Sequence, residues 1–253
     1  MLSASSDINV ISLALCILIL SFSYTIFGIT GFGQNAISVP FLLLFVPLKF
    51  GITLVVLLDT VFVSWGAMKF NHQANFKELT PMLPAVVIGL VLGAISLSFL
   101  PEHILLLSLG AFIVCYAAYG FVCRQRIGRI SRLAAAPIGL VGGLFSAAFG
   151  TGGPIHIIYI TGRMVEKNQI RASILIISTL AVIARLVAFG YSGFFNDRSI
   201  WIWWACALPF CLIGVRLGHR MHNAVNDAIV LNAIRALLLL SGGLLIFRNL
   251  KGL

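Results

Sequence analysis

Charged residues are scarce in this chain. Only 9% of its 253 residues are Asp, Glu, Lys or Arg, whereas about a quarter of a soluble domain is charged. Apolar residues make up 60%, and apolar runs of about 20 residues, long enough to cross a hydrocarbon layer, recur along the whole length. The sequence therefore predicts an all-α polytopic integral membrane protein that forms a single membrane domain, with no room for a second, soluble domain.

Acidic residues are the scarcest charged class. Asp and Glu number 7 against 17 Lys and Arg, which gives a formal net charge of +10. The basic residues lie in the breaks between apolar runs, where the cytoplasmic loops of membrane proteins concentrate Lys and Arg. We therefore interpret the charge as a sign of topology and expect no nucleic-acid partner.

Metal-binding and redox motifs are also missing from the pattern. The five cysteines fall inside or at the ends of apolar runs and never as C-x-x-C, which favours a role as small apolar side chains in helix packing. His219 and His222 have i, i+3 spacing but no third ligand nearby. We expect neither a metal nor another cofactor.

Turn residues and charges divide the chain into ten apolar segments. They lie near residues 10–30, 34–47, 51–69, 80–100, 104–123, 134–149, 154–162, 170–191, 200–218 and 228–247. The first has no Lys or Arg before it and no small-residue cleavage site after it, so we expect it to remain as the first span. The second and seventh are too short for ordinary spans, and each follows a glycine-rich break, which predicts halves of broken helices.

The chain also shows signs of an internal duplication. The Leu-Pro, Ile-Gly and Leu-Gly pairs of residues 83–93 recur in residues 208–218 at a constant offset of 125, and the glycine breaks at 31–33 and 150–152 match at an offset of 119. Two matches in the same order and at similar offsets favour a repeat over coincidence. The glycines at 89, 93, 214 and 218 are also explained by close helix contacts.

The matches predict two repeats of five segments each. The first repeat covers residues 1–123, the second covers 133–253, and a basic linker at 124–132 joins them. Because five is an odd number, the second repeat is inverted relative to the first. Each repeat then contains one short segment after its glycine break.

The distribution of Lys and Arg tests whether the short segments cross the membrane. If all ten segments cross, eleven basic residues lie on one side, namely Lys69, Lys77, Arg124, Arg126, Arg129, Arg132, Arg163, Lys167, Arg171, Arg216 and Arg220, and four lie on the other, namely Lys49, Arg198, Arg248 and Lys251. If both short segments re-enter, the tally weakens to nine against six. The positive-inside rule favours ten crossings, with both termini outside and the linker in the cytoplasm.

The glycine breaks are the first candidate site. A backbone break at membrane depth leaves N–H and C=O groups without partners unless they face protein, water or a ligand, and a helix that restarts there points its positive end into the gap. Hydrogen-bonding side chains without negative charge flank both breaks, which favours a small oxyanion over a metal cation; they are Thr30, Gln34, Asn35 and Ser38 at the first break and Thr151, His156, Tyr159 and Thr161 at the second. The predicted substrate-binding residues are Gly31, Gly33, Gln34, Asn35, Gly150, Gly152, Gly153, His156 and Arg185.

Charges inside the predicted spans are the second candidate feature. Asp59 lies in the middle of the third segment, about nine residues from either end, and is predicted to couple protons or to hold Arg185. Arg185 lies in the equivalent segment of the other half. It and Arg235 could also be structural arginines that reach an interface. The near-symmetric placing raises the hypothesis that Asp59 and Arg185 meet near the repeat interface.

At these residues the sequence resembles the sulfite exporter TauE/SafE family, also described as the four-toluene-sulfonate uptake permease family. The marks are the glycine-rich elements at 31–35 (Gly-Phe-Gly-Gln-Asn) and 150–154 (Gly-Thr-Gly-Gly-Pro), Pro40 after the first, and a G-x-x-x-G late in each half. The resemblance covers nearly the whole chain. Gln34, Asn35 and Pro154 stand where glycines are usual, which affects the substrate more than the family.

The resemblance implies a carrier of a sulfur-containing oxyanion, namely sulfite, a sulfonate, sulfoacetate or thiosulfate. We expect a secondary transporter of the bacterial inner membrane that works by alternating access; its coupling ion stays open, with protons as the candidate because of Asp59. The expected partners are the small anion, the lipid bilayer and protons, with a homo-oligomer left open.

A passive anion channel is the nearest alternative to a transporter. An intramembrane enzyme is less well supported, because the spans offer neither paired carboxylates nor H-E-x-x-H, so we expect no catalytic residue. A structural or assembly protein of the membrane is a further alternative.

Overall fold

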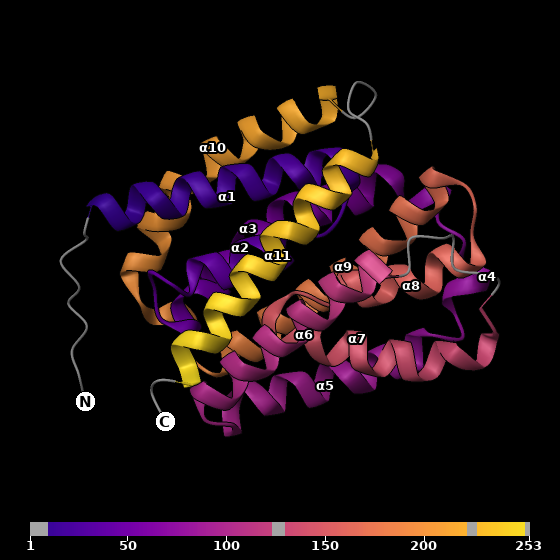
Figure 1. The fold of residues 1–253 in the computed structure, drawn as a ribbon, viewed down its shortest axis with the longest axis horizontal. Helices are drawn as coiled ribbons and strands as arrows, with labels where there is room; N and C mark the ends of the chain where they lie inside the picture. Colours follow the sequence, from indigo (N-terminus) through magenta and orange to yellow (C-terminus); the bar gives the residue numbers. More distant parts are fainter. Residues whose placement is uncertain (1–9, 123–129, 222–226, 251–253) are drawn as a thin grey trace.

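The computed structural model describes residues 10–122, 130–221 and 227–250, which form helices and turns without a strand. The elements in chain order are α1 (Val10–Thr30), α2 (Gln34–Leu42), α3 (Leu48–Phe70), η1 (Asn71–Gln73), α4 (Phe76–Leu79), α5 (Leu83–Phe99), α6 (Glu102–Val122), η2 (Arg132–Ala134), α7 (Ala135–Phe149), α8 (Gly153–Arg163), α9 (Lys167–Tyr191), η3 (Phe194–Asn196), α10 (Arg198–Met221) and α11 (Asp227–Leu250) (Figure 1). The predicted all-α class is confirmed.

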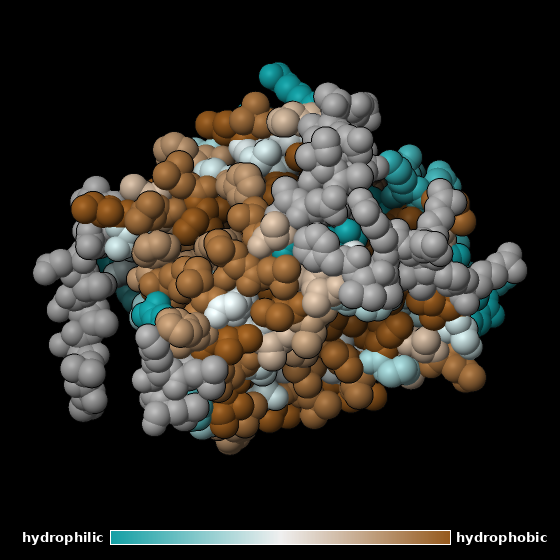
Figure 2. Space-filling view, viewed as in Figure 1, coloured by the Kyte–Doolittle hydropathy of each residue, from teal (hydrophilic) through white to brown (hydrophobic). Residues whose placement is uncertain are grey.

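The helices and their surface fit a hydrocarbon environment. Within the described chain, six helices are long and apolar enough to cross a membrane, namely α1, α3, α6, α7, α9 and α10, and α5 is an apolar but shorter helix. Figure 2 shows apolar residues over much of the molecule's face, and large side chains such as Ile88, Val91 and Phe99 are exposed. A helix satisfies its own backbone hydrogen bonds, which is what lipid requires. The prediction of a polytopic membrane protein is confirmed.

The two short segments are short helices in the structure. α2 has 9 residues and α8 has 11, so at 1.5 Å per residue they extend only about 14 Å and 17 Å, roughly half of a hydrocarbon layer. The second segment was predicted to reach residue 47, but α2 ends at Leu42 because the chain then turns through residues 43–46 into Pro47.

Glycines make both helix breaks. α1 ends where the Gly31 N–H donates to the carbonyl of Phe27 at 2.7 Å, and Gly31 and Gly33 have φ of +83° and +85°. α7 ends at Gly150, which has φ of +73° and donates to the carbonyl of Ser146 at 2.9 Å. Residues other than glycine rarely adopt these left-handed backbone conformations, so the glycines determine where each helix breaks.

Helices from the two halves of the chain pack in matching pairs. α1 packs along α10, α7 along α5, α6 along α11 and α3 along α9. The first two pairs meet at glycines: a Cβ on Gly218 would lie 2.9 Å from the Cα of Gly28, and one on Gly143 would lie 3.1 Å from the Cα of Gly89. Close helix contact therefore explains these glycines. The inverted repeat itself stays a prediction, which this pairing favours.

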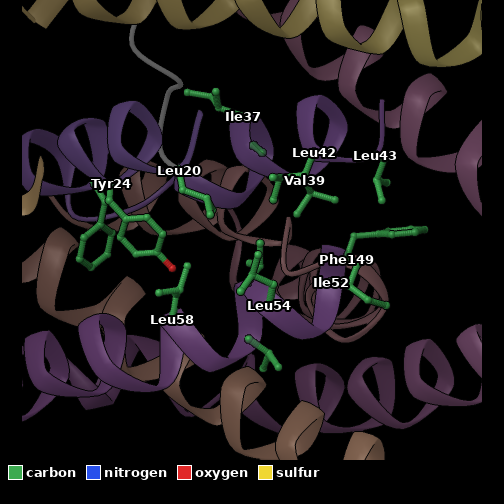
Figure 3. Close-up of a cluster of buried hydrophobic side chains, with 14 of the residues drawn as sticks. Leu20, Tyr24, Ile37, Val39, Leu42, Leu43, Ile52, Leu54, Leu58 and Phe149 are labelled. Atoms are coloured by element: carbon green, nitrogen blue, oxygen red, sulfur yellow. The ribbon is translucent and has the colours of Figure 1, made fainter. Parts of the chain in front are cut away.

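The α3 helix is the most enclosed of the candidate spans. In the apolar stretch of α3, 72% is buried inside the molecule, whereas at most 50% is buried in the corresponding stretches of the other candidate spans. Figure 3 shows a cluster of buried apolar side chains from α1, α2 and α3, with Leu20 and Leu58 near Tyr24 and Val39 farther along the cluster beside Leu42. A polar group on the buried side of α3, such as Asp59, is therefore surrounded by protein and not by lipid.

Loops sort to two opposite ends of the molecule (Figure 1). At one end, which we call the Pro47 end, the turn after α2 accepts a hydrogen bond from Arg248 of α11 at the Leu44 carbonyl (2.8 Å), and the Leu48 N–H donates to Glu102 of α6 (3.3 Å). At the other, the Glu78 end, Glu78 of α4 binds Arg132 and Arg163. This alternation follows the ten-segment prediction, while the side on which each end lies stays a prediction.

Candidate functional site

A carboxylate buried in α3 is the centre of the site. Asp59 is only 1% exposed. Its Oδ1 accepts hydrogen bonds from the Tyr24 hydroxyl at 2.9 Å and from Gln34 Nε2 at 3.0 Å. Its Oδ2 accepts from Asn35 Nδ2 at 2.5 Å and from Arg185 Nη2 at 2.9 Å. These four donors come from α1, α2 and α9 and replace the water that the carboxylate loses on burial.

Arg185 is the counter-charge of Asp59. The Arg185 side chain is 3% exposed, and its salt bridge to Asp59 joins α9 to α3. Asp59 and Arg185 therefore meet, as the sequence-based hypothesis proposed. A guanidinium carries five N–H donors, and the Arg185 Nε and Nη1 atoms are buried without a hydrogen-bond partner. The Asp59 contact thus leaves part of the donor capacity of Arg185 unused.

The two glycine breaks approach each other at this ion pair. Asn35, at the start of α2 after the first break, donates from Nδ2 to the carbonyl oxygen of Gly150 in the second break at 3.2 Å. A Cβ on Gly150 would lie 2.5 Å from Arg185 Nη1 and 2.6 Å from Asn35 Nδ2. Gly150 therefore lets the backbone of the second break come within van der Waals distance of the Arg185 guanidinium.

A small cavity of about 20 Å³ lies between the breaks and the ion pair. Its lining consists of Phe27, Gly31, Phe32, Gly33, Gln34, Asn35, Ala36, Asp59, Val63, Ser146, Gly150, Gly153, Pro154, Ser178, Ala181, Val182 and Arg185. This volume has room for about one water molecule. A multi-atom ligand therefore needs the surrounding helices to separate before it can enter.

Most of the predicted site residues meet at this cavity. Gly31, Gly33, Gln34, Asn35, Gly150, Gly153, Asp59 and Arg185 all line it. Gly152 and His156 do not line it: a Cβ on Gly152 would collide with Ser146 of α7, and the His156 ring, 1% exposed, packs on Gly142 of α7. Their predicted role in binding the substrate therefore has no support from the shape of the cavity.

Three polar side chains of the site were not found from the sequence. Tyr24 donates to Asp59, and Ser146 of α7 and Ser178 of α9 line the cavity. A tyrosine in the middle of an apolar span is a usable signal, because its buried hydroxyl requires a hydrogen-bond partner. The two serines give no comparable signal, since serines in spans commonly bond to their own helix backbone.

No cluster of three or more His, Cys, Asp or Glu side chains that could hold a metal ion occurs among the residues placed by the structure. Cys16 and Cys211 are buried as free thiols, whereas Cys115 and Cys206 are exposed on the helix surface. Cys123 and His222, which belong to the cysteine and histidine patterns discussed from the sequence, lie outside the described residues. The described cysteines are compatible with helix packing.

Ion pairs at the Glu78 end hold α8 in place. Glu78 accepts hydrogen bonds from Arg163 Nε at 2.7 Å and Arg132 Nη2 at 3.0 Å. These arginines, Arg163 first, lower the pKa of the Glu78 carboxyl from 4.5 to about 2. Arg163 also donates to the carbonyl of Ile130 at 3.2 Å. The cluster joins α4 in the first half of the chain to the last turn of α8 in the second half.

Comparison with known proteins agrees with this architecture. The family described as Sulfite exporter TauE/SafE matches residues 15–245. The probable inner membrane transporter protein TsaS of Comamonas testosteroni is 29% identical over 193 residues, which cover 75% of this chain and 80% of that protein. No solved structure gives a significant match. Since the family match spans most of the residues, the chain belongs to the sulfite exporter TauE/SafE family of membrane transporters.

Proposed function

We propose that the protein is a secondary transporter that moves a small sulfur-containing oxyanion, of the sulfite, sulfonate, sulfoacetate or thiosulfate class, across the inner membrane by alternating access. The observation that carries the proposal is the burial of Arg185 together with its unused hydrogen-bond donors. Arg185 is a buried guanidinium with two nitrogens that lack a partner, and it lies at a cavity between two broken helices. We assign no catalytic residue.

The donors around the cavity suit an oxyanion. α2 begins after Gly33 without a side-chain cap, and α8 begins after Gly152 in the same way. The first N–H groups of each helix have no partner within it and give its start a partial positive charge. A sulfite or sulfonate group has several oxygens that accept hydrogen bonds and none that donate when it is ionised. Such a group complements Arg185 together with the start of α2.

The small cavity favours a carrier over the alternative of a passive channel. A channel requires a continuous pore, whereas this cavity has a volume of about 20 Å³. In a carrier, such a conformation corresponds to an occluded state between the two openings. Rocking of the packed halves about the α3 and α9 pair would then open the site to each side in turn. This step rests on the proposed inverted repeat.

Charge balance at the ion pair supports proton coupling through Asp59. The Asp59 and Arg185 pair is neutral as a unit, and both groups are buried. Adding an anion alone would leave one net negative charge in a low-dielectric site, which is costly. A proton on Asp59 would restore neutrality and free Arg185 to bind the anion. The proposed cycle therefore carries a proton and an anion together.

Flux into liposomes tests the proposal. Purified protein would be reconstituted and offered labelled sulfite, sulfate, thiosulfate, taurine or sulfoacetate, with and without an imposed proton gradient. We expect at least one sulfur compound to accumulate only with the gradient. We expect Asp59→Asn to lose this accumulation while it retains exchange of substrate across the membrane. Gradient-independent flux that never exceeds equilibrium would indicate the channel, and no flux of any anion would reject transport.

A further inference from the structure

Arg171 lies on the same face of α9 as the candidate site. Ser178 and Arg185 of α9 line the cavity, and Arg171 precedes them at spacings of 7 and 14 residues. Residues at i, i+7 and i+14 share one face of a helix. The three side chains therefore lie on one side of α9, between the Glu78 end of the molecule and the cavity, over about 21 Å of helix.

The Arg171 side chain lies against the first glycine break. A Cβ on Gly31 would lie 2.6 Å from Arg171 Cγ and 2.7 Å from Arg171 Nε. Gly31 also lines the cavity. The backbone at Gly31 is thus in contact with Arg171 and is also part of the cavity wall.

The hydrogen bonds of Arg171 leave donor capacity unused. Its Nη2 donates to the Gly28 carbonyl at a long 3.4 Å, and its guanidinium lies 5.1 Å from the centre of the Phe70 ring. Its Nε is buried without a partner. A half-buried cation with a buried, unsatisfied Nε next to a proposed anion site requires an explanation.

Capping of α1 is a weak explanation for this arginine. The end of α1 already has its own cap, because the Gly31 N–H donates to Phe27 (2.7 Å) and the Thr30 hydroxyl donates to Ile26 (2.9 Å). The one carbonyl that Arg171 reaches is at the limit of hydrogen-bond distance. This one long contact to Gly28 therefore does not account for the whole donor capacity of the guanidinium.

We propose that Arg171 is a second anion contact, on the route between the cavity and the Glu78 end. The inference rests on the proposed function. An anion that leaves Arg185 toward this end passes the first break, where the Arg171 guanidinium offers free N–H donors and a positive charge. A second cation there lowers the barrier that a desolvated anion meets on leaving the first.

Transport measured separately from each side tests the role of Arg171. Right-side-out and inside-out membrane vesicles would be compared, using whichever labelled sulfur anion the wild type carries. We expect Arg171→Gln to raise KM about tenfold or more for substrate offered from the Glu78 end, since charge-assisted hydrogen bonds are lost. We expect the KM for substrate offered from the Pro47 end to change much less. Arg171→Lys keeps the charge and should restore most of the loss.

The controls separate this role from stability and from general surface charge. Arg216→Gln removes a charge from an exposed position on α10 and should leave both KM values unchanged. Thermal unfolding shows whether Arg171→Gln is folded; if it is not, the KM of Arg171→Lys, together with its dependence on ionic strength, decides. Equal effects from both sides, or no effect, would overturn the assignment while leaving the proposed function intact. A wild type without flux rejects both.

Discussion

At the scale of single residues, the account depends on one buried charge pair. Asp59 satisfies both carboxylate oxygens with four donors, whereas Arg185 leaves two nitrogens unused. This asymmetry matters because a purely structural ion pair needs its hydrogen bonds satisfied on both sides. Arg185 therefore combines a structural contact with donor groups that are available to a ligand.

We expect the two charges to be strongly coupled in stability. Arg185→Gln leaves Asp59 as an unpaired buried charge and should lower the free energy of unfolding by about 3 kcal/mol or more. The double variant Asp59→Asn with Arg185→Gln removes both charges and should be less destabilised than the sum of the single variants. Denaturation in detergent measures all three. Additive losses would show that the two side chains do not interact.

At the scale of helices, the glycine breaks decide how near backbone and charge can come. Gly150 has φ of +73°, and a side chain there would meet Arg185 and Asn35. Gly190, by contrast, lies within α9, and a Cβ added to it would meet nothing within 4 Å. The two positions offer a matched pair for testing what glycine contributes.

We expect Gly150→Ala to weaken substrate binding about tenfold or more, because it strains the backbone and displaces the guanidinium. Gly190→Ala should leave binding unchanged and stabilise the helix slightly, by about 0.5–1 kcal/mol. Titration of anion binding and thermal unfolding give the two readouts. Equal binding by both variants would mean that the close approach at Gly150 has no part in recognition.

A second helix-scale prediction concerns the ion pairs that hold α8. The folded protein keeps the pKa of Glu78 at about 2, below its ordinary 4.5. The stabilisation is therefore complete above pH 4.5 or so, and it is lost as the pH falls toward 2. We expect the difference in melting temperature between the wild type and Glu78→Gln to be largest near neutral pH and to shrink below pH 4.5.

Glu166→Gln is the matched control for Glu78→Gln. Glu166 is exposed and accepts a hydrogen bond from Gln169 at 2.8 Å, so its removal breaks no contact between the halves of the chain. Its effect on melting temperature should be small at every pH. A difference between the wild type and Glu78→Gln that does not change from pH 7 to pH 2.5 would contradict the ion-pair explanation.

At the scale of the whole molecule, sequence patterns predicted most of the helices. The first segment, at 10–30, has the same bounds as α1, and α3 begins three residues before its predicted start at 51 because Pro47 precedes the helix. The four-residue α4 was not predicted, since a single polar turn has no periodicity to detect.

The candidate site was predictable only in part. Glycine breaks and intramembrane charges are rare features, so they identified Asn35, Asp59 and Arg185 from the sequence. Side-chain direction is not encoded in that way. His156 lies three residues from Gly153, yet its ring packs on Gly142 of α7, which depends on how α7 and α8 meet in three dimensions.

Topology gives a prediction for the whole molecule. In a variant that lacks the native cysteines, a membrane-impermeant thiol reagent should label Asp197→Cys at the Pro47 end in intact cells. It should label Lys77→Cys at the Glu78 end only after the membrane is opened. Both positions are exposed in the structure. The reverse pattern would place the basic loops outside and would contradict the proposed orientation.

The measurement that tests the central claim most directly is the affinity of the purified protein for sulfite, thiosulfate, taurine and sulfoacetate, compared among wild type, Arg185→Lys and Arg185→Ala. Lys keeps the charge but loses the planar set of donors, and Ala loses both. We expect the wild type to bind at least one of these compounds through its sulfur oxyanion group, Arg185→Lys to bind it about tenfold more weakly, and Arg185→Ala to lose still more. Affinity that is unchanged in both folded variants would remove Arg185 from the site and contradict the account.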